Sequence, residues 1–441
     1  MNEKNSKRRY LAPFIFLSVI AVIALIPVDD TTPHVADAAI NGADTAWMLM
    51  ASALVLLMTP GLAFFYGGMV RYKNLVSTLL QSFITLGIIS VIWIVVGFSL
   101  AFGDSIGGFI GNPLTFFMFK NVGTAPNPDF AATIPFVLFA VFQLKFAIIT
   151  PALITGGLAE RIRFSSLMLF IVLFSLFIYA PLAHWTWHPE GFLHKWGVLD
   201  FAGGTVVHIS AGFAALSGAI FLGRRKDGEE SNPTNVPYIL LGTGLLWFGW
   251  FGFNGGSALA ANEVAVTAFI NTNLASATAM LTWMLTDGAR GKKRSATGAA
   301  VGAVVGLVAI TPAAGFVNVG QSIFIGFAGA LVSYFAVRLK SRSSIDDTLD
   351  VFPCHGIGGM VGMLLTGVFA KDVGLIYGDP TIFLYHVVAL IVVGVFTFGG
   401  SYLLYKLTNL ILPMRVTELQ EERGLDITQH GEVATDISSS F

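Results

Sequence analysis

Residues 76–102 read VSTLLQSFITLGIISVIWIVVGFSLAF, a run of 27 residues without a charged side chain. About 20 apolar residues are enough for an α-helix to cross the hydrocarbon core of a bilayer. The run lies between Lys73 and Asp104, and charges that flank an apolar run mark where a helix leaves the membrane. This stretch therefore predicts a transmembrane helix.

The composition of the whole chain agrees with a membrane protein. Of its 441 residues, 55% are apolar and only 12% are charged, whereas soluble domains average about 25% charged residues. The mean hydropathy is +0.74. The formal net charge of −1 and the lack of a long basic block give no support to a nucleic-acid partner. A single cysteine, Cys354, excludes an internal disulfide and a thiolate metal cluster.

Apolar segments of similar length recur along the rest of the chain. They cover residues 47–69, 76–102, 133–157, 164–183, 203–222, 237–258, 265–286, 298–317, 319–338, 352–370 and 383–407. If the first enters from outside, the inner side receives 21 of the 25 Lys and Arg residues, as the positive-inside rule requires. The sequence therefore predicts an all-α polytopic protein of the cytoplasmic membrane, with eleven transmembrane helices and a cytoplasmic C-terminus.

The first 38 residues have the layout of a secretory signal peptide. Four basic residues within 1–10 precede a 16-residue apolar run at 11–26, and the small-residue stretch 35–39 follows. An uncleaved anchor helix is the alternative. An odd number of spans places the mature N-terminus outside, which itself requires a translocation signal. We therefore expect a signal peptide at 1–38, an eleven-span membrane domain at 44–412 and a cytoplasmic tail at 413–441, either solvated or a docking element.

Two histidines fall inside predicted spans, where ionisable side chains are costly and usually functional. His208 lies in the fifth span and His355 in the tenth, each after an aspartate, Asp200 and Asp350 respectively. The two spans run in opposite directions and are five spans apart. This arrangement predicts two five-helix inverted repeats plus a final helix, with a shared site near the membrane midplane.

Three interpretations of the histidine pair compete. A metal site needs three or four ligands, but no carboxylate or thiolate lies one helical turn from either histidine, so no metal or cofactor is expected. Two structural histidines, each bonded to a backbone carbonyl, are the second interpretation. The third is a proton-capable, hydrogen-bonding lining of a narrow path, because imidazole both donates and accepts near neutral pH.

Two further residues in or beside spans are unusual. Asp200 precedes His208 by eight residues, about 12 Å of helical rise, so it is not expected to touch the ring. The following Gly203 and Gly204 suggest that Asp200 instead caps and fixes the local backbone. Lys145 lies about twelve residues into the third span, too deep to reach water easily. An ion pair, loss of its proton or a misplaced span boundary would each explain it.

Aromatic residues near the outer ends of spans offer a possible cation site. Phe142 and Phe146 are one turn apart, Trp187 begins an outer loop, and Phe253 lies in the sixth span before Ser257. Rings of this kind bind small cations through their quadrupole, although any one of 38 Phe residues can equally be core or lipid-facing. The spans contain no acidic ring, which a channel for hydrated metal cations is expected to have.

Several long motifs resemble one known family. They are PGLAFFYGG at 60–68, AER at 159–161, DFAGGTVVH at 200–208, WFGFNGGS at 250–257, DVFPCHG at 350–356, EERGLD at 421–426 and HGE at 430–432. In this order, from about residue 44 to 434, they resemble the ammonium transporter (Amt/Mep/Rh) family, and its Amt branch rather than its Rh branch. The tail motifs resemble those of bacterial and archaeal members.

The resemblance implies a function and a role for each site residue. It implies selective ammonium uptake, with ammonium recruited at an outer site made by Phe142, Phe146, Trp187 and Ser257 and supported by Asp200. Phe146 and Phe253 are then the gate, and His208 and His355 line the hydrophobic pore. A homotrimer with one pore per subunit, surrounded by membrane lipid, and regulation by cytoplasmic PII signalling proteins are also implied.

Other functions stay open on the sequence alone. One is an electroneutral ammonia channel, which differs by the absence of charge movement. Another is an ammonium sensor that signals through its tail. An enzyme is not expected, because no span has a Ser/His pair, an HExxH motif or a pair of aspartates.

Overall fold

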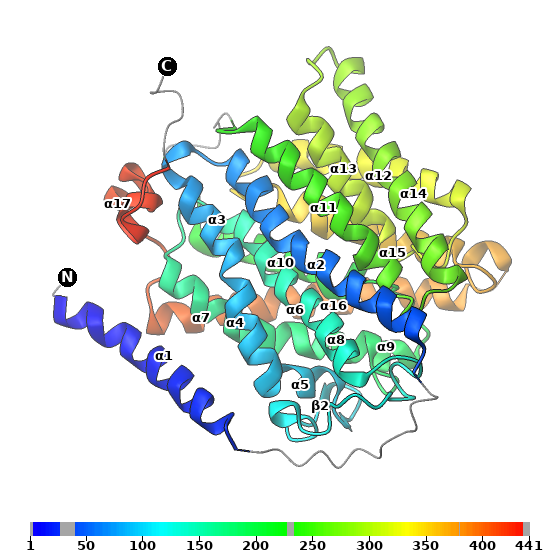
Figure 1. Cartoon of the computed structure of the whole chain (residues 1–441). Helices are drawn as coiled ribbons and strands as arrows, with labels where there is room; N and C mark the ends of the chain where they lie inside the picture. The colour runs from blue at the N-terminus through cyan, green and yellow to red at the C-terminus, as the bar shows by residue number, and fades with distance from the viewer. Residues whose placement is uncertain (1–2, 27–39, 227–232, 379, 435–441) are drawn as a thin grey trace.

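The computed structural model describes residues 3–26, 40–226, 233–378 and 380–434, which form a helical bundle (Figure 1). Among these residues ten helices or helix runs are long and apolar enough to cross a membrane. They are α2 (Gly42–Met69), the run Tyr72–Phe102, α6 (Phe136–Leu158), the run Phe164–Lys195, η6 with α10 (Gly204–Leu222), α11 (Val236–Gly256), α12 (Glu263–Ala289), α14 (Val319–Lys340), η7 with α15 (Phe352–Phe369) and α16 (Thr381–Ile411).

The remaining predicted span, 298–317, is shorter than expected. Its helix, α13, covers only Ala296–Ile310, 15 residues. Pro312 lies two residues after the last helical residue, and proline ends a helix because it lacks an N–H and its ring clashes with the preceding turn. Residues 311–317 therefore form turns, although they are mostly apolar. Ten predicted spans are confirmed as sufficiently long helices, and α13 is too short to be counted with them.

Several spans are broken into shorter pieces. Residues 72–102 combine α3 (Leu75–Phe83), α4 (Thr85–Ile92), a π-helical turn and α5 (Phe98–Phe102). Residues 164–195 combine α7 (Phe164–Phe174), a π-helical turn, α8 (Ala180–Trp187) and α9 (Phe192–Lys195). A two-stranded antiparallel hairpin, β1 (Ser105–Ile106) and β2 (Ile110–Gly111), follows α5.

Helix α1 (Glu3–Ile23) stands apart from the bundle (Figure 1). Its apolar side chains are exposed, for example Phe14 at 67%. The small residues 35–39 of the predicted cleavage site lie outside the described residues, so the structure does not test that part of the signal-peptide prediction.

Glycines let the helices pack closely. Helix α2 lies along α11, and a Cβ added at Gly242 would come within 2.3 Å of the Phe65 backbone nitrogen. Helix α13 packs on α12, where a Cβ at Gly306 would meet the Ala275 carbonyl at 2.4 Å. Small residues at helix contacts are needed in lipid, where no hydrophobic force drives helices together. Gly298, Gly302 and Gly306, which follow one another at four-residue spacing on α13, therefore serve helix packing.

Two π-helical turns carry the histidines of the predicted pore. His208 lies in η6 (Gly204–Ile209) and His355 in η7 (Phe352–Ile357). Both turns continue into ordinary helix, α10 (Ser210–Leu222) and α15 (Gly358–Phe369). Turns of this kind are rare in proteins and occur frequently at functional sites.

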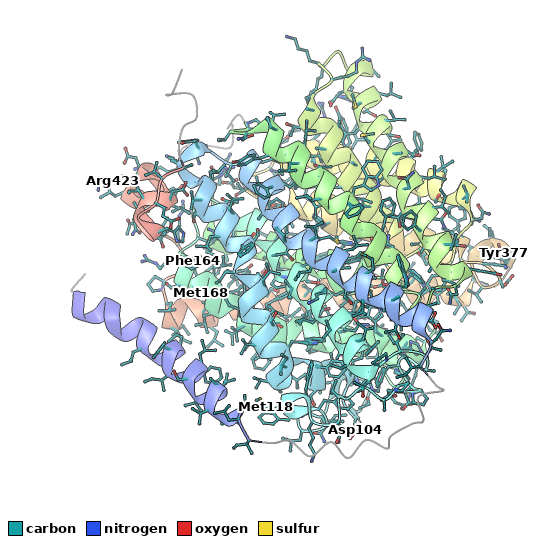
Figure 2. All side chains as sticks on the ribbon, in the orientation of Figure 1. Asp104, Met118, Phe164, Met168, Tyr377 and Arg423 are labelled. Carbon is teal, nitrogen blue, oxygen red and sulfur yellow. The ribbon has the colours of Figure 1, made fainter. Side chains whose placement is uncertain are left out.

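The described part of the tail, residues 413–434, docks on other segments of the chain. The Asp426 carboxylate accepts hydrogen bonds from the backbone nitrogens of Val76 and Ser77 at 3.0 and 2.8 Å, at the start of α3. The His430 ring meets the Phe164 ring edge-on at 4.9 Å. Figure 2 labels Phe164 at the start of α7, beside the tail helix α17 (Glu418–Arg423) that carries Arg423.

A buried ion network lies next to the docked tail. Glu160 is fully buried and pairs with Arg71 at 2.7 Å and Arg225 at 2.6 Å, and Arg225 also pairs with Asp346 at 2.8 Å. Burial alone would raise the pKa of Glu160, but the Arg71 hydrogen bonds and the two positive charges lower it to about 2. The network ties together four inter-helix loops from distant parts of the sequence.

Candidate functional site

Four of the predicted site residues line one cavity. Phe142, Phe146, Trp187 and Ser257 surround a space of about 250 Å³. The Phe142 and Phe146 rings meet edge-on with centroids 4.9 Å apart, and Trp187 meets Phe146 in the same way at 5.8 Å. We call this space the outer cavity. Its ring faces suit a small cation, because the face of an aromatic ring is its electronegative part.

Local structure explains why these side chains converge. Phe142 and Phe146 are one turn apart on α6, and Trp187 is the last residue of α8 rather than the first of a loop. The Trp187 indole donates a hydrogen bond to the Asp200 carbonyl at 3.1 Å. Ser257 follows the end of α11, and its hydroxyl donates to the Phe253 carbonyl at 2.8 Å. Since that bond uses the hydroxyl proton, the lone pairs of the Ser257 oxygen can still accept.

A pair of phenylalanines closes the inner side of the outer cavity. The Phe146 and Phe253 rings lie 4.3 Å apart at an interplanar angle of 38°, and both are buried. Below them the Phe253 ring lies 6.1 Å from the His208 ring. The structure therefore brings the two predicted gate residues together, directly before the first histidine.

The two histidines meet at the centre of the bundle. Their rings lie 5.4 Å apart, and the two Nδ1 atoms are 3.4 Å apart in a weak hydrogen bond. The His208 ring also stacks on the Trp250 indole at 5.4 Å and 19°. Because one Nδ1 must donate and the other accept, the pair holds its two rings in complementary tautomers.

The surroundings of the pair bear on two of the three interpretations of its role. Within the described part of the chain His208 Nε2 has no hydrogen-bond partner, and no backbone carbonyl bonds to either ring. The interpretation as structural, carbonyl-bonded histidines is therefore not supported. The described residues also contain no group of three or more His, Cys, Asp or Glu side chains that could hold a metal.

A second cavity begins at His355. It has a volume of about 470 Å³, and Tyr66, Lys340, Asp350 and Cys354 are also among its lining residues. We call it the inner cavity. Phe146, Phe253, His208 and His355 thus form a continuous line of rings from the outer cavity to the inner one.

Asp200 caps the first histidine segment, as the sequence predicted. Its carboxylate accepts hydrogen bonds from the backbone nitrogens of Gly203, Gly204 and Thr205 at 2.8, 2.6 and 2.7 Å. The Thr205 hydroxyl donates a fourth bond at 2.5 Å. Gly203 has φ 124°, a conformation that favours glycine. One carboxylate therefore fixes the backbone that presents His208, and the carbonyl of the same residue holds the Trp187 indole.

The aspartate that matches Asp200 in the second half is Asp347, not Asp350. The Asp347 carboxylate accepts from the backbone nitrogens of Val351 and Phe352 at 3.1 and 2.7 Å. It precedes His355 by eight residues, as Asp200 precedes His208. Asp350 instead has φ 57° and pairs with Lys340 at 2.9 Å beside the inner cavity. The sequence analysis named Asp350 as the aspartate before His355, and the shared eight-residue spacing that points to Asp347 was the signal that it missed.

Lys145 keeps its unusual position. It lies well inside α6, so the span boundary was not misplaced. It is half-buried, and the structure gives it no ion pair or hydrogen bond with any other described residue. It does not line the outer or the inner cavity.

Trp250 is a site residue that the sequence did not single out. In the sequence it is one of many aromatic residues, whereas in the structure its indole stacks on the His208 ring.

Comparisons with known proteins agree with these features. A model described as Ammonium Transporter Family matches residues 46–435. An ammonium transporter of Bacillus subtilis (strain 168) is 48% identical over 399 residues, which cover 89% of this chain and 98% of that protein. The solved structure of Candida albicans Mep2 is similar with a TM-score of 0.82 and 36% identity, over 87% of this chain and 88% of that one.

A structure described as a sensor Amt protein is also similar, with a TM-score of 0.81 and 31% identity over 88% of this chain and 98% of that one. The family match covers most of the chain, and the relatives are matched over nearly their full length. On this basis the chain belongs to the ammonium transporter family.

Proposed function

We propose that this chain takes up ammonium selectively across the cytoplasmic membrane. The observation that carries the proposal is the line of buried rings between two cavities, in a chain of the ammonium transporter family. Its relatives are named as transporters or as a sensor, and we propose no enzymatic activity.

Ammonium binds first in the outer cavity. Its charge lies against the faces of Phe142, Phe146 and Trp187, and Ser257 accepts one of its hydrogen bonds. Asp200 acts indirectly by holding Trp187 and the glycine turn in place. The site needs no resident metal or cofactor for this step.

Selectivity follows from deprotonation. Ammonium is close to potassium in size, so an oxygen-lined filter would separate the two poorly. Passing Phe146 and Phe253 requires a species that can shed its charge, and only ammonium has a proton to give up. Potassium must carry its full desolvation cost, several kcal/mol or more, along a dry path. Neutral ammonia passes His208 and His355 by accepting a hydrogen bond from one imidazole at a time.

The membrane topology that we propose has eleven spans, with α13 as a short eighth. The first ten helices form two inverted five-helix repeats, and α16 is the final helix. The matching Asp–His segments of the two halves support the repeat, and the loop Lys and Arg residues support a cytoplasmic tail. Residues 1–38 act as a signal peptide, 44–412 as the transport domain and 413–441 as the tail, with the mature N-terminus outside.

The partners that we propose come from the family resemblance. They are two further copies of the chain in a homotrimer, membrane lipid, and a cytoplasmic PII-type protein that inserts a loop into the inner cavity. Arg225 and Lys340 line that cavity and give it basic groups for such a loop.

A current measurement tests the function. Purified protein in a solid-supported membrane receives a jump in ammonium concentration, with a potassium jump as control. We expect an ammonium-specific current in the wild type that disappears when His208 and His355 are both replaced by Ala. Absence of current, in protein that still binds ammonium, would favour an electroneutral ammonia channel. A sensor that signals through the docked tail is the other alternative, since one similar structure is described as a sensor Amt protein.

A further inference from the structure

We propose that Lys145 is a specificity-determining residue, whose positive charge weakens the binding of cations in the outer cavity and at the Phe146–Phe253 gate. The inference rests on the proposed ammonium transport. It concerns a side chain that lies behind the cation site, on the same helix as two of its aromatic rings, and that the transport path does not use.

The position of Lys145 on α6 places it close to the site. Lys145 follows Phe142 by three residues and precedes Phe146 by one. Residues three apart on a helix are surface neighbours, with Cβ atoms about 5–6 Å apart. We therefore infer a separation of about one helix diameter, roughly 10–12 Å, between its ammonium group and a cation held against those rings.

The burial pattern of α6 shows which way the side chain leaves the helix. Val137, Val141 and Lys145 are half-buried and four residues apart, whereas every residue from Phe146 to Ile162 is buried. Lys145 is thus the deepest half-exposed position on that face. Helical side chains lean toward the helix N-terminus, which is the outer end of α6 in the proposed topology. The side chain can therefore lie along the two valines with its charged end toward the outer surface.

The charge acts through the helix without touching the substrate. Lys145 has no ion pair with a described residue to cancel its charge, and its neighbours Leu144 and Phe146 on α6 are apolar. Repulsion at this distance opposes ammonium and potassium alike but leaves neutral ammonia unaffected. The residue therefore lowers cation occupancy and favours passage of the deprotonated form.

The test compares three variants by ammonium uptake into proteoliposomes. Lys145→Met removes the charge and keeps an unbranched helix-forming side chain. We expect its half-saturating ammonium concentration to fall about tenfold with little change in maximal rate. Lys145→Arg keeps the charge and should stay within about twofold of the wild type. Lys120→Met removes an exposed lysine of an outer loop and should also stay within about twofold.

Each outcome bears on one claim. An unchanged half-saturating concentration in Lys145→Met, in protein with the wild-type elution profile, overturns the proposal. So does a Lys145→Arg variant that binds ammonium much more weakly than the wild type, because the wild-type lysine would then be uncharged. Lack of ammonium uptake by the wild type would instead count against the proposed transport function.

Discussion

The two histidine segments of this chain share a scaffold but differ in how firmly it is held. In both, an aspartate eight residues before the histidine accepts hydrogen bonds from the start of a π-helical turn. Asp200 accepts four such bonds, whereas Asp347 accepts two and lies close to the Asp350 carboxylate. The outer segment is therefore held by more hydrogen bonds, and in the inner one the neighbouring Asp350 charge disfavours the ionised form of Asp347.

The difference matches the work that we propose for each segment. In that proposal the outer one fixes the cation site and the gate, where a small displacement would disturb the ring geometry. The inner one opens on a larger cavity beside the Lys340–Asp350 pair, where only a hydrogen-bonding histidine is needed. The two segments thus share one backbone motif, although the inner one has half as many bonds to its aspartate.

Replacing each aspartate by Ala should have the largest effect on ammonium uptake, and the effect should differ between the two segments. Asp200→Ala leaves three buried backbone N–H groups without a partner and releases Trp187, so we expect at least a hundredfold loss of ammonium uptake, roughly 3 kcal/mol. Asp347→Ala leaves only two, and about a tenfold loss is expected. Uptake rates in proteoliposomes at equal protein amounts measure both.

The comparison of the two alanine variants needs a control variant in which the amount of protein and its folding change little. Thr205→Val removes one of the four donors to Asp200 while keeping the backbone bonds, and its loss should be smaller than that of either alanine variant. Equal losses in Asp200→Ala and Asp347→Ala would contradict the claim that the outer segment bears the greater structural demand.

Acidic replacements of the histidines should leave the ammonium current in place but remove the selectivity for ammonium over potassium. In His208→Asp or His355→Glu a carboxylate replaces the imidazole and can hydrate the dry path. We expect the ammonium current to persist within about tenfold and a potassium current to appear, since the desolvation cost for potassium falls by several kcal/mol. Currents after alternating ammonium and potassium jumps provide the measurement. Continued exclusion of potassium by these variants would weigh against selectivity by deprotonation.

Most of the fold can be predicted from the sequence because the relevant signals are strong in a membrane protein. Uncharged runs such as 76–102, together with the Lys and Arg residues of the loops, locate the helices. Apolar composition cannot tell a helix from an apolar turn, which is why the predicted eighth span wrongly includes residues 311–317. Pro312 was the sequence signal that the helix ends early, since a proline at that place interrupts the hydrogen-bond ladder.

The candidate site, like the fold, could be predicted only in part from the sequence. The aromatic and histidine positions lie in or beside recognisable motifs, and the structure brings them into one line. The roles of Trp250 and Asp347 depend on which side chains face each other across helices, and one sequence contains little information on that. For Asp347, equal spacing in the two halves was a usable signal, but Asp350 lay inside the more conspicuous motif.

The last effect that we expect is on stability rather than on uptake, and it concerns the inner aspartate alone. Burial and the neighbouring Asp350 carboxylate raise the pKa of Asp347 to about 6, although the Phe352 and Val351 N–H groups oppose this. Its folded pKa lies above its unfolded value of about 3.9, so the folded protein binds the proton more tightly. Stability from this group is then complete below pH 4 and is lost as the pH rises through 6, about 3 kcal/mol in all.

Asp347→Asn should remove this dependence, so that the unfolding midpoint in detergent no longer falls between pH 5 and pH 7. Glu160 is the matched opposite, because its pKa of about 2 lies below its unfolded value and its stabilisation is lost only as the pH falls toward 2. Glu160→Gln should therefore lower stability at pH 7, by about 3 kcal/mol, and leave the slope between pH 5 and pH 7 intact. A wild-type midpoint that is flat over that interval would mean that Asp347 stays ionised, and the repulsion between Asp347 and Asp350 would then not weaken the inner segment.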